Sequence, residues 1–114
     1  MFSIERQDTD GGCRIAVSGE MTIYGAAELK SKLIEAAGAA KAIECDLTEV
    51  SDFDSTGVQL VLLLQRAATD IGGSMQVTGA SDAVRELLDL YRLSGELIAA
   101  ADAGDRAGNS GRQS

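Results

Sequence analysis

Asp52-Phe53-Asp54-Ser55-Thr56-Gly57 stands directly in front of an apolar run that covers residues 58–68. Two carboxylates and two hydroxyls therefore precede a segment with the composition of a helix. The start of a helix presents free backbone N–H groups and a partial positive charge, which favour an anion. Four interpretations fit this pattern: a calcium loop, a phosphatase nucleophile, a phosphorylatable serine and a plain helix cap.

The composition indicates one small, acidic domain. Of its 114 residues, 45% are hydrophobic, which suffices for a single core, built mainly of aliphatic side chains because Trp is absent. The net charge of −8 argues against binding to nucleic acid or approach to an anionic lipid surface. No segment has the roughly 18 apolar residues of a membrane span, and the N-terminus does not resemble a signal peptide. We therefore expect a cytoplasmic protein without direct membrane insertion.

Two cysteines, Cys13 and Cys45, lie in apolar runs that are typical of strands. Their spacing is not that of metal ligands and the chain contains no histidine, so the sequence predicts neither a metal site nor a cofactor. We expect both thiols to be reduced and to lie in the core.

Hydrophobic periodicity predicts alternating strands and helices. Expected strands span residues 2–7, 13–18, 41–47 and 74–78, with a Gly-rich hairpin turn between the first two. Expected helices span residues 24–39, the run after the acidic-hydroxyl motif, and residues 82–91, the last capped by Ser81 or Asp82. A final short element is expected in residues 93–100. This order predicts an α/β sheet whose later connections are right-handed parallel crossovers.

The helical segments differ in how clearly they define a buried face. In the first, the spacing selects Ala27, Leu29, Leu33, Ile34 and Ala37, and in the third, Val84, Leu87, Leu88 and Tyr91. The second helix is apolar on nearly all sides, so it is either buried or partly exposed to a partner, and base rates favour burial. We expect the folded domain to span residues 1–100 and residues 101–114 to form a disordered tail of small and polar residues.

The metal and phosphoaspartyl interpretations lack residues that they need. An EF-hand loop starting at Asp52 requires a carboxylate at its twelfth position, which is Leu63 here. The motif also resembles the nucleophile of haloacid dehalogenase-type phosphotransferases, but those enzymes need a downstream lysine, and every lysine of this chain precedes the motif. The missing lysine and the ββα opening also disfavour a receiver domain. A magnesium-dependent phosphatase using Asp52 remains a minor alternative.

A plain cap is compatible with every function. Asp54, Ser55 or Thr56 could cap the second helix, and Thr56-Gly57-Val58-Gln59 fits the capping-box pattern, in which Gln59 reaches back. Such a cap contributes about 1 kcal/mol of stability. Because capping and modification can share one site, the cap does not exclude a phosphorylatable serine.

Asp46-Leu47 followed by Asp54-Ser55-Thr56-Gly57 resembles the strand–loop–helix signature of STAS domains, the sulphate transporter and anti-sigma factor antagonist fold. Three further segments are similar to the family: Ser18-Gly19-Glu20-Met21, Ile71-Gly72-Gly73 and Ala83-Val84-Arg85-Glu86-Leu87-Leu88. The resemblance covers roughly residues 2–98. It implies a mixed sheet of four to five strands with an N-terminal antiparallel hairpin and three to four α-helices packed against it.

The resemblance also implies a function. In anti-sigma antagonists of this family, an anti-sigma kinase phosphorylates the first hydroxyl of the pair, which is Ser55 here, with Thr56 as the second choice. The unphosphorylated antagonist binds the anti-sigma factor and frees the sigma factor, and phosphorylation breaks that complex. The implied protein is a non-enzymatic interaction switch, monomeric when free, whose partner is an anti-sigma factor kinase or another regulatory protein. The expected partner-binding residues are Thr22, Tyr24, Asp54, Ser55, Thr56, Gly57, Gln59 and Leu60.

The connection after the second strand favours an alternative partner. Anti-sigma antagonists of the family commonly carry an aspartate at the position of Thr22. Residues 22–29 look more like stand-alone STAS proteins of chemotaxis systems, or the STAS subunit of phospholipid-transport ABC ATPases. In a constitutive adaptor of either kind, Ser55 and Thr56 would only cap the helix and pack against the partner.

Overall fold

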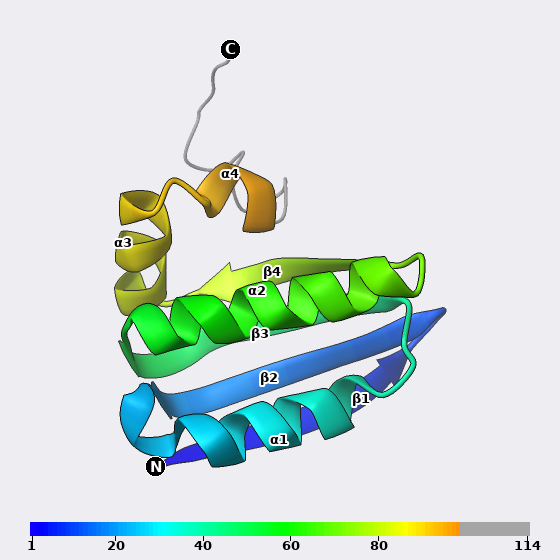
Figure 1. Cartoon of the computed structure of the whole chain (residues 1–114), viewed down its shortest axis with the longest axis horizontal. Helices are drawn as coiled ribbons and strands as arrows, with labels where there is room; N and C mark the ends of the chain where they lie inside the picture. Colours follow the sequence, from blue (N-terminus) through cyan, green and yellow to red (C-terminus); the bar gives the residue numbers. More distant parts are fainter. Residues whose placement is uncertain (99–114) are drawn as a thin grey trace.

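Leu33, Leu47, Val61 and Leu88 come from four different elements and meet in one core, where none of them is exposed to solvent. The computed structural model describes residues 1–98. They form one mixed sheet, and Figure 1 shows two long helices running over the same face of that sheet. The core lies between these helices and the sheet.

The sheet contains four strands in the order β1-β2-β3-β4, with β1 antiparallel to β2 and the two later pairs parallel. The elements are β1 (Phe2–Thr9), β2 (Gly12–Met21), the 3-10 turn η1 (Ile23–Gly25), α1 (Ala26–Ala37), β3 (Ala42–Phe53), α2 (Ser55–Asp70), β4 (Ser74–Ala80), α3 (Asp82–Leu90) and α4 (Ser94–Leu97). The predicted α/β class, N-terminal hairpin and parallel pairing are therefore confirmed.

The hairpin is longer than the sequence indicates. Its register runs from Phe2 opposite Gly19 to Thr9 opposite Gly12, which leaves a two-residue turn at Asp10 and Gly11. Gly11 has φ of +82°, a conformation that glycine adopts without steric cost. Pairing between the two strands therefore extends the strand conformation to residues whose sequence shows no alternation of polar and apolar side chains.

Strand β3 corrects the prediction most, because it continues to Phe53 rather than ending at Leu47. Against β2 it carries extra residues at two places, after Asp46 and after Val50. The first bulge shifts the buried side from Leu47 to Val50, a spacing of three. A bulge breaks the period of two on which strand prediction depends, so the second half of the strand was missed.

The predicted helical faces are confirmed in part. In α1, Leu29, Leu33 and Ala37 are buried as expected, whereas Ala27 and Ile34 are exposed. In α3, capped by Ser81, Val84 and Leu88 are buried and Leu87 is half-buried, but Tyr91 follows the helix and is exposed. Helix α1 begins at Ala26 rather than residue 24, because residues 23–25 form η1. In α2, Leu60, Val61 and Leu64 are buried, whereas Leu62 and Leu63 are half-buried, so burial predominates.

The opposite face of the sheet is polar and includes an ion pair between neighbouring strands. Glu5, Glu44 and Gln76 on this face are exposed. The Arg14 guanidinium donates to Asp46, whose other oxygen accepts from the Thr48 hydroxyl at 2.6 Å and from the Thr48 N–H at 3.0 Å. Partial burial acts to raise the pKa of the Asp46 carboxyl, but the Thr48 hydrogen bonds and Arg14 outweigh it and hold that pKa below 3.8.

Both cysteines are free and fully buried in the core, as predicted. Burial raises the pKa of the Cys45 thiol to about 12, with smaller contributions from the negative charge of Asp46 and from Cys13. Cys45 is therefore uncharged at neutral pH and lacks the thiolate form that reacts with electrophiles.

Helix α4 falls within the last element that the sequence predicts for residues 93–100. Residues 99–114, which include the expected tail from residue 101, lie outside the described residues. The helices within residues 1–98 are all too short or too polar to cross a membrane.

The Asp46 interactions predict a pH-dependent contribution to stability. Because the folded pKa lies below the ordinary value of 3.8, the contribution is complete above that value and disappears as the pH falls through the folded pKa. Asp46→Asn should therefore lower the free energy of unfolding at neutral pH by at most about 1 kcal/mol, since the pair is partly exposed. Urea unfolding at about pH 7 and about pH 2.5 should show the two proteins converging in acid.

Glu44→Gln provides the control, because it removes an exposed carboxylate from the same face of β3. We expect this variant to have wild-type stability at both pH values. A difference between wild type and Asp46→Asn that stays constant with pH would contradict the electrostatic explanation.

Candidate functional site

The candidate functional site lies at the turn from β3 into α2, where Asp54 caps the helix. Asp54 has an extended backbone and occupies the N-cap of α2. Its Oδ1 accepts from the N–H of Thr56 at 2.9 Å and from the N–H of Gly57 at 3.4 Å. Two of the free donors at the helix start are thus satisfied by a carboxylate, which also suits the positive end of the helix dipole.

Of the three candidate caps, Asp54 is the one that the structure supports, and the capping box starting at Thr56 is wrong. Thr56 is the second residue of the helix, so its N–H donates to the cap residue. Gln59 is exposed and is the fifth residue of α2, two residues beyond the third position, from which the partner of a capping box reaches back.

Ser55 is the first residue of α2 and its side chain is exposed. Within residues 1–98, no group hydrogen bonds to its hydroxyl, whereas the neighbouring Thr56 is half-buried. The Ser55 oxygen is therefore accessible from solvent, next to a helix start whose N–H groups favour anions. Of the two hydroxyl residues at this helix start, Ser55 is therefore the more exposed.

The connection from β2 into α1 lies directly beside this helix start. The N–H of Asp54 donates to the Met21 carbonyl at 3.4 Å, and Asp54 Oδ2 accepts from the N–H of Ile23 at 3.1 Å. Thr22 is half-buried. Ile23 and Tyr24 are 66% and 94% exposed, so two large apolar side chains project from η1 into solvent. The sequence predicts Thr22 and Tyr24 as partner-binding residues but does not indicate that Ile23 is exposed. The segment between strand and helix is too short to show a periodicity from which exposure could be predicted.

A shallow groove of about 360 Å³ continues the site between α1 and α2. Its lining residues are Ala26, Ala27, Lys30, Thr56, Gln59, Leu60 and Leu63. The structure therefore brings together three of the expected partner-binding residues, Thr56, Gln59 and Leu60, and adds Lys30. Leu60 is only 5% exposed, so it forms the floor of the groove rather than a projecting contact.

Gly57, one of the expected partner-binding residues, has a role in packing. It is buried, and a Cβ at this position would lie 2.5 Å from the Phe53 ring and 2.9 Å from the Met21 carbonyl oxygen. The absence of a side chain therefore allows α2 to start close to the ends of β2 and β3.

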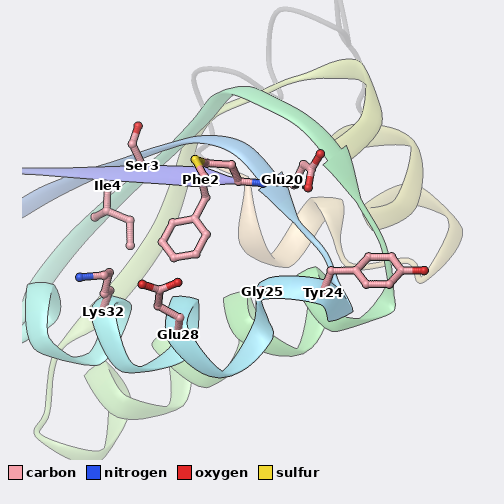
Figure 2. Close-up of a pocket in the computed structure, with 9 residues that line it drawn as sticks. Phe2, Ser3, Ile4, Glu20, Tyr24, Gly25, Glu28 and Lys32 are labelled. Carbon is pink, nitrogen blue, oxygen red and sulfur yellow. Dashed lines mark hydrogen bonds and ion pairs between the residues drawn. The ribbon is translucent and has the colours of Figure 1, made fainter.

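A second groove, of about 470 Å³, lies on the other side of α1, between β1 and α1. Figure 2 shows Phe2 and Ile4 pointing from β1 toward Glu28 and Lys32 of α1, while Tyr24 projects away from them. Among its polar lining groups, the Met1 ammonium donates to Glu20 at 2.9 Å, and the Ser3 hydroxyl lies 2.6 Å from the Ser18 hydroxyl. Helix α1 thus separates this groove from the one that contains Thr56.

The chemistry available at the site is limited. The chain has no histidine, and the carboxylate nearest to Ser55 in sequence, Asp54, is occupied by backbone N–H groups. A serine without a hydrogen-bonded base is a weak nucleophile. The site therefore presents an exposed serine close to exposed apolar side chains.

Comparison with known proteins identifies the family. A family model described as "Mlab, STAS domain" matches residues 4–99. The chain belongs to the STAS domain family, and the resemblance seen in the sequence is confirmed.

Several relatives that are described as anti-sigma factor antagonists are similar to this chain. The anti-sigma-B factor antagonist of Bacillus subtilis (strain 168) is 24% identical over 92 residues, which cover 81% of this chain and 84% of that protein. An anti-sigma factor antagonist from Mycobacterium paratuberculosis, at 22% identity, has a similar structure, with a TM-score of 0.74 and coverage of 96% of both chains.

A third relative has been solved in two states. The unphosphorylated form of the anti-sigma factor antagonist SpoIIAA has a TM-score of 0.69 and 25% identity, covering 97% of this chain and 100% of that chain. The phosphorylated form of SpoIIAA, a Bacillus cell fate determinant, has a TM-score of 0.64 and 24% identity, covering 93% and 98%. The fold is thus shared with a protein that exists in both states.

The close packing at Gly57 predicts that Gly57→Ala is destabilising. Alanine has a helix propensity about 1 kcal/mol better than glycine, but its Cβ would overlap the Phe53 ring. Such overpacking costs about 1–3 kcal/mol, so we expect a net loss of stability in thermal or urea unfolding. Gly95→Ala is the matched control, because Gly95 lies in α4 with no atom within 4 Å of its added Cβ. Equal stabilisation of both variants would contradict the packing role of Gly57.

Proposed function

We propose that this protein is a protein-interaction switch of the anti-sigma factor antagonist type, controlled by phosphorylation of Ser55. Thr56 is the second candidate. The observation that carries the proposal is the exposed Ser55 hydroxyl at the start of α2, beside the exposed apolar turn η1. A partner that contacts η1 and the start of α2 would cover the serine, so a phosphate there would stand inside the interface.

The relatives support this proposal. SpoIIAA is described by name as an anti-sigma factor antagonist, and structures exist of its unphosphorylated and phosphorylated forms. In the proposed reaction, a kinase transfers the γ-phosphoryl group of ATP to the Ser55 oxygen, ADP leaves, and the hydroxyl proton is released to the kinase. The protein itself acts as substrate and binding partner, not as an enzyme.

Electrostatics favour a switch that acts between proteins. A phosphate adds about −1.5 to −2 charges at neutral pH. The start of α2 would attract it by about 0.3–1 kcal/mol, whereas Asp52 and Asp54 repel it by a comparable amount. These two contributions nearly cancel in the overall stability of the free protein. In an interface the same charge would be desolvated or meet a partner carboxylate, at a cost of several kcal/mol.

The proposed partner is an anti-sigma factor with serine kinase activity, or another regulatory protein, in the cytoplasm. Exposed Ile23 and Tyr24 provide apolar contacts, and Thr22, Asp54, Thr56 and Gln59 surround them with polar groups. This combination of an apolar centre and a polar rim is typical of protein–protein interfaces. The free protein is proposed to be a monomer.

Ser55→Glu should weaken partner binding by about thirtyfold or more, which corresponds to about 2 kcal/mol, because it places a charge in the interface. The measurement is calorimetric titration against the anti-sigma factor kinase encoded in the same genome. Ser74→Glu is the matched control, since Ser74 is also exposed but lies at the start of β4, at the opposite end of the sheet. Ser74→Glu and Ser55→Ala should bind as the wild type does.

Incubation with that kinase and ATP should add a phosphate to Ser55, detected by mass spectrometry and absent in Ser55→Ala. If no phosphate is found on Ser55, the switch proposal is wrong. The alternative of a constitutive chemotaxis or lipid-transport adaptor predicts instead that Ser55→Glu binds its partner as tightly as wild type does.

Tyr24→Ala should weaken binding to the same partner by about tenfold, since exposed aromatic side chains are enriched among residues that dominate binding. Tyr24 is 94% exposed, so the free energy of unfolding should change by no more than about 0.5 kcal/mol. Ile71→Ala is the control, because Ile71 is an exposed apolar residue at the other end of α2. Wild-type affinity in Tyr24→Ala would remove η1 from the proposed interface.

A further inference from the structure

The two carboxylate oxygens of Asp54 hold different segments of the chain. Oδ1 accepts from the N–H groups of Thr56 and Gly57 in α2, whereas Oδ2 accepts from the N–H of Ile23 in η1, at 3.1 Å. The backbone N–H of Asp54 also donates to the carbonyl of Met21. A single side chain next to Ser55 therefore links the start of α2 to η1.

Few other interactions fix η1. None of its three residues is buried, and Thr22, which precedes it, makes no side-chain capping hydrogen bond. Within residues 1–98, Asp54 is the one residue whose side chain hydrogen bonds to η1. A segment with little buried surface and few hydrogen bonds opens at a low free-energy cost. The bond from Ile23 to Asp54 is therefore a main restraint on the position of Ile23 and Tyr24.

We infer that Asp54 is a positioning residue that couples the charge state of residue 55 to the order of η1. An anionic group on residue 55 enters the same helix start and competes for the N–H groups of Thr56 and Gly57. Repulsion between this anion and the adjacent carboxylate displaces Asp54, and the Ile23 N–H loses its acceptor. The inference rests on the proposed function only in that phosphate is the anion that residue 55 receives in the cell.

The regulatory consequence is that modification acts on two parts of the binding surface. The phosphate blocks the start of α2 directly, and the loss of the Asp54–Ile23 bond loosens the turn that presents Ile23 and Tyr24. The change remains local, because the buried residues of α1 and α2 do not depend on this bond.

Asp54→Asn separates the two tasks of the side chain. Asparagine caps helices about as well as aspartate, so its side-chain carbonyl oxygen can still accept from the N–H groups at the start of α2. Its NH2 group cannot accept a hydrogen bond from the Ile23 N–H. Hydrogen exchange of the whole chain, followed by NMR, should show the Ile23 amide exchanging about tenfold faster than in wild type. The Val58 amide, which donates to the Asp54 carbonyl at 3.2 Å, is the internal control and should be unchanged. Asp54→Ser, whose shorter side chain also caps helices, should give the same result.

A double-mutant cycle with Ser55→Glu tests the coupling itself. In the wild-type background, Ser55→Glu should accelerate Ile23 exchange about tenfold, and in the Asp54→Asn background it should have no further effect. Unchanged Ile23 exchange in both Asp54 variants, or equal acceleration by Ser55→Glu in both backgrounds, would overturn the inference. Because no kinase is involved, this result is independent of whether Ser55 is phosphorylated.

Discussion

The hydrogen bonds of the Asp54 carboxylate join chain segments that are 31 residues apart and fix the geometry of the whole site. The helix start, the serine beside it and the exposed turn η1 would be three separate features without this residue. The carboxylate satisfies backbone donors on both sides, so its charge stabilises the site while remaining close to the position where a further negative charge would be added. An anion on residue 55 would therefore lie next to a carboxylate whose two oxygens already accept from backbone N–H groups.

Asp54 lies directly after the carboxyl end of β3, at one edge of the sheet. Strands β2 and β3 are parallel, and their carboxyl ends meet where Met21 is paired with Phe53. In open α/β sheets, ligands bind in the crevice outside the carboxyl ends of the strands. The bulges in β3 change which side chains are buried, and Gly57 allows α2 to begin close to the same edge.

The sequence predicts the elements whose periodicity is regular, and it fails where the period changes. Leu29, Leu33 and Ala37 have a simple helical spacing and are buried as expected. Residues 48–53 have no regular alternation because β3 is bulged, so their strand conformation depends on pairing with β2. The sequence predicts that the cap of α2 is Asp54, Ser55 or Thr56, but it does not distinguish among them. The backbone conformation that makes Asp54 the cap depends on hydrogen bonds with the distant residues Met21 and Ile23. Exposure of Ile23 was missed for the same reason.

The burial of both cysteines has a practical consequence for studying the site. Cys13 and Cys45 have no exposed surface, and the sequence contains no other cysteine. A cysteine introduced on the surface would thus be the one thiol open to a maleimide dye while the protein is folded. The native protein already has the background needed for single-site fluorescence labelling, so the movement of η1 relative to α2 could be followed by a dye on η1 without removing a core residue.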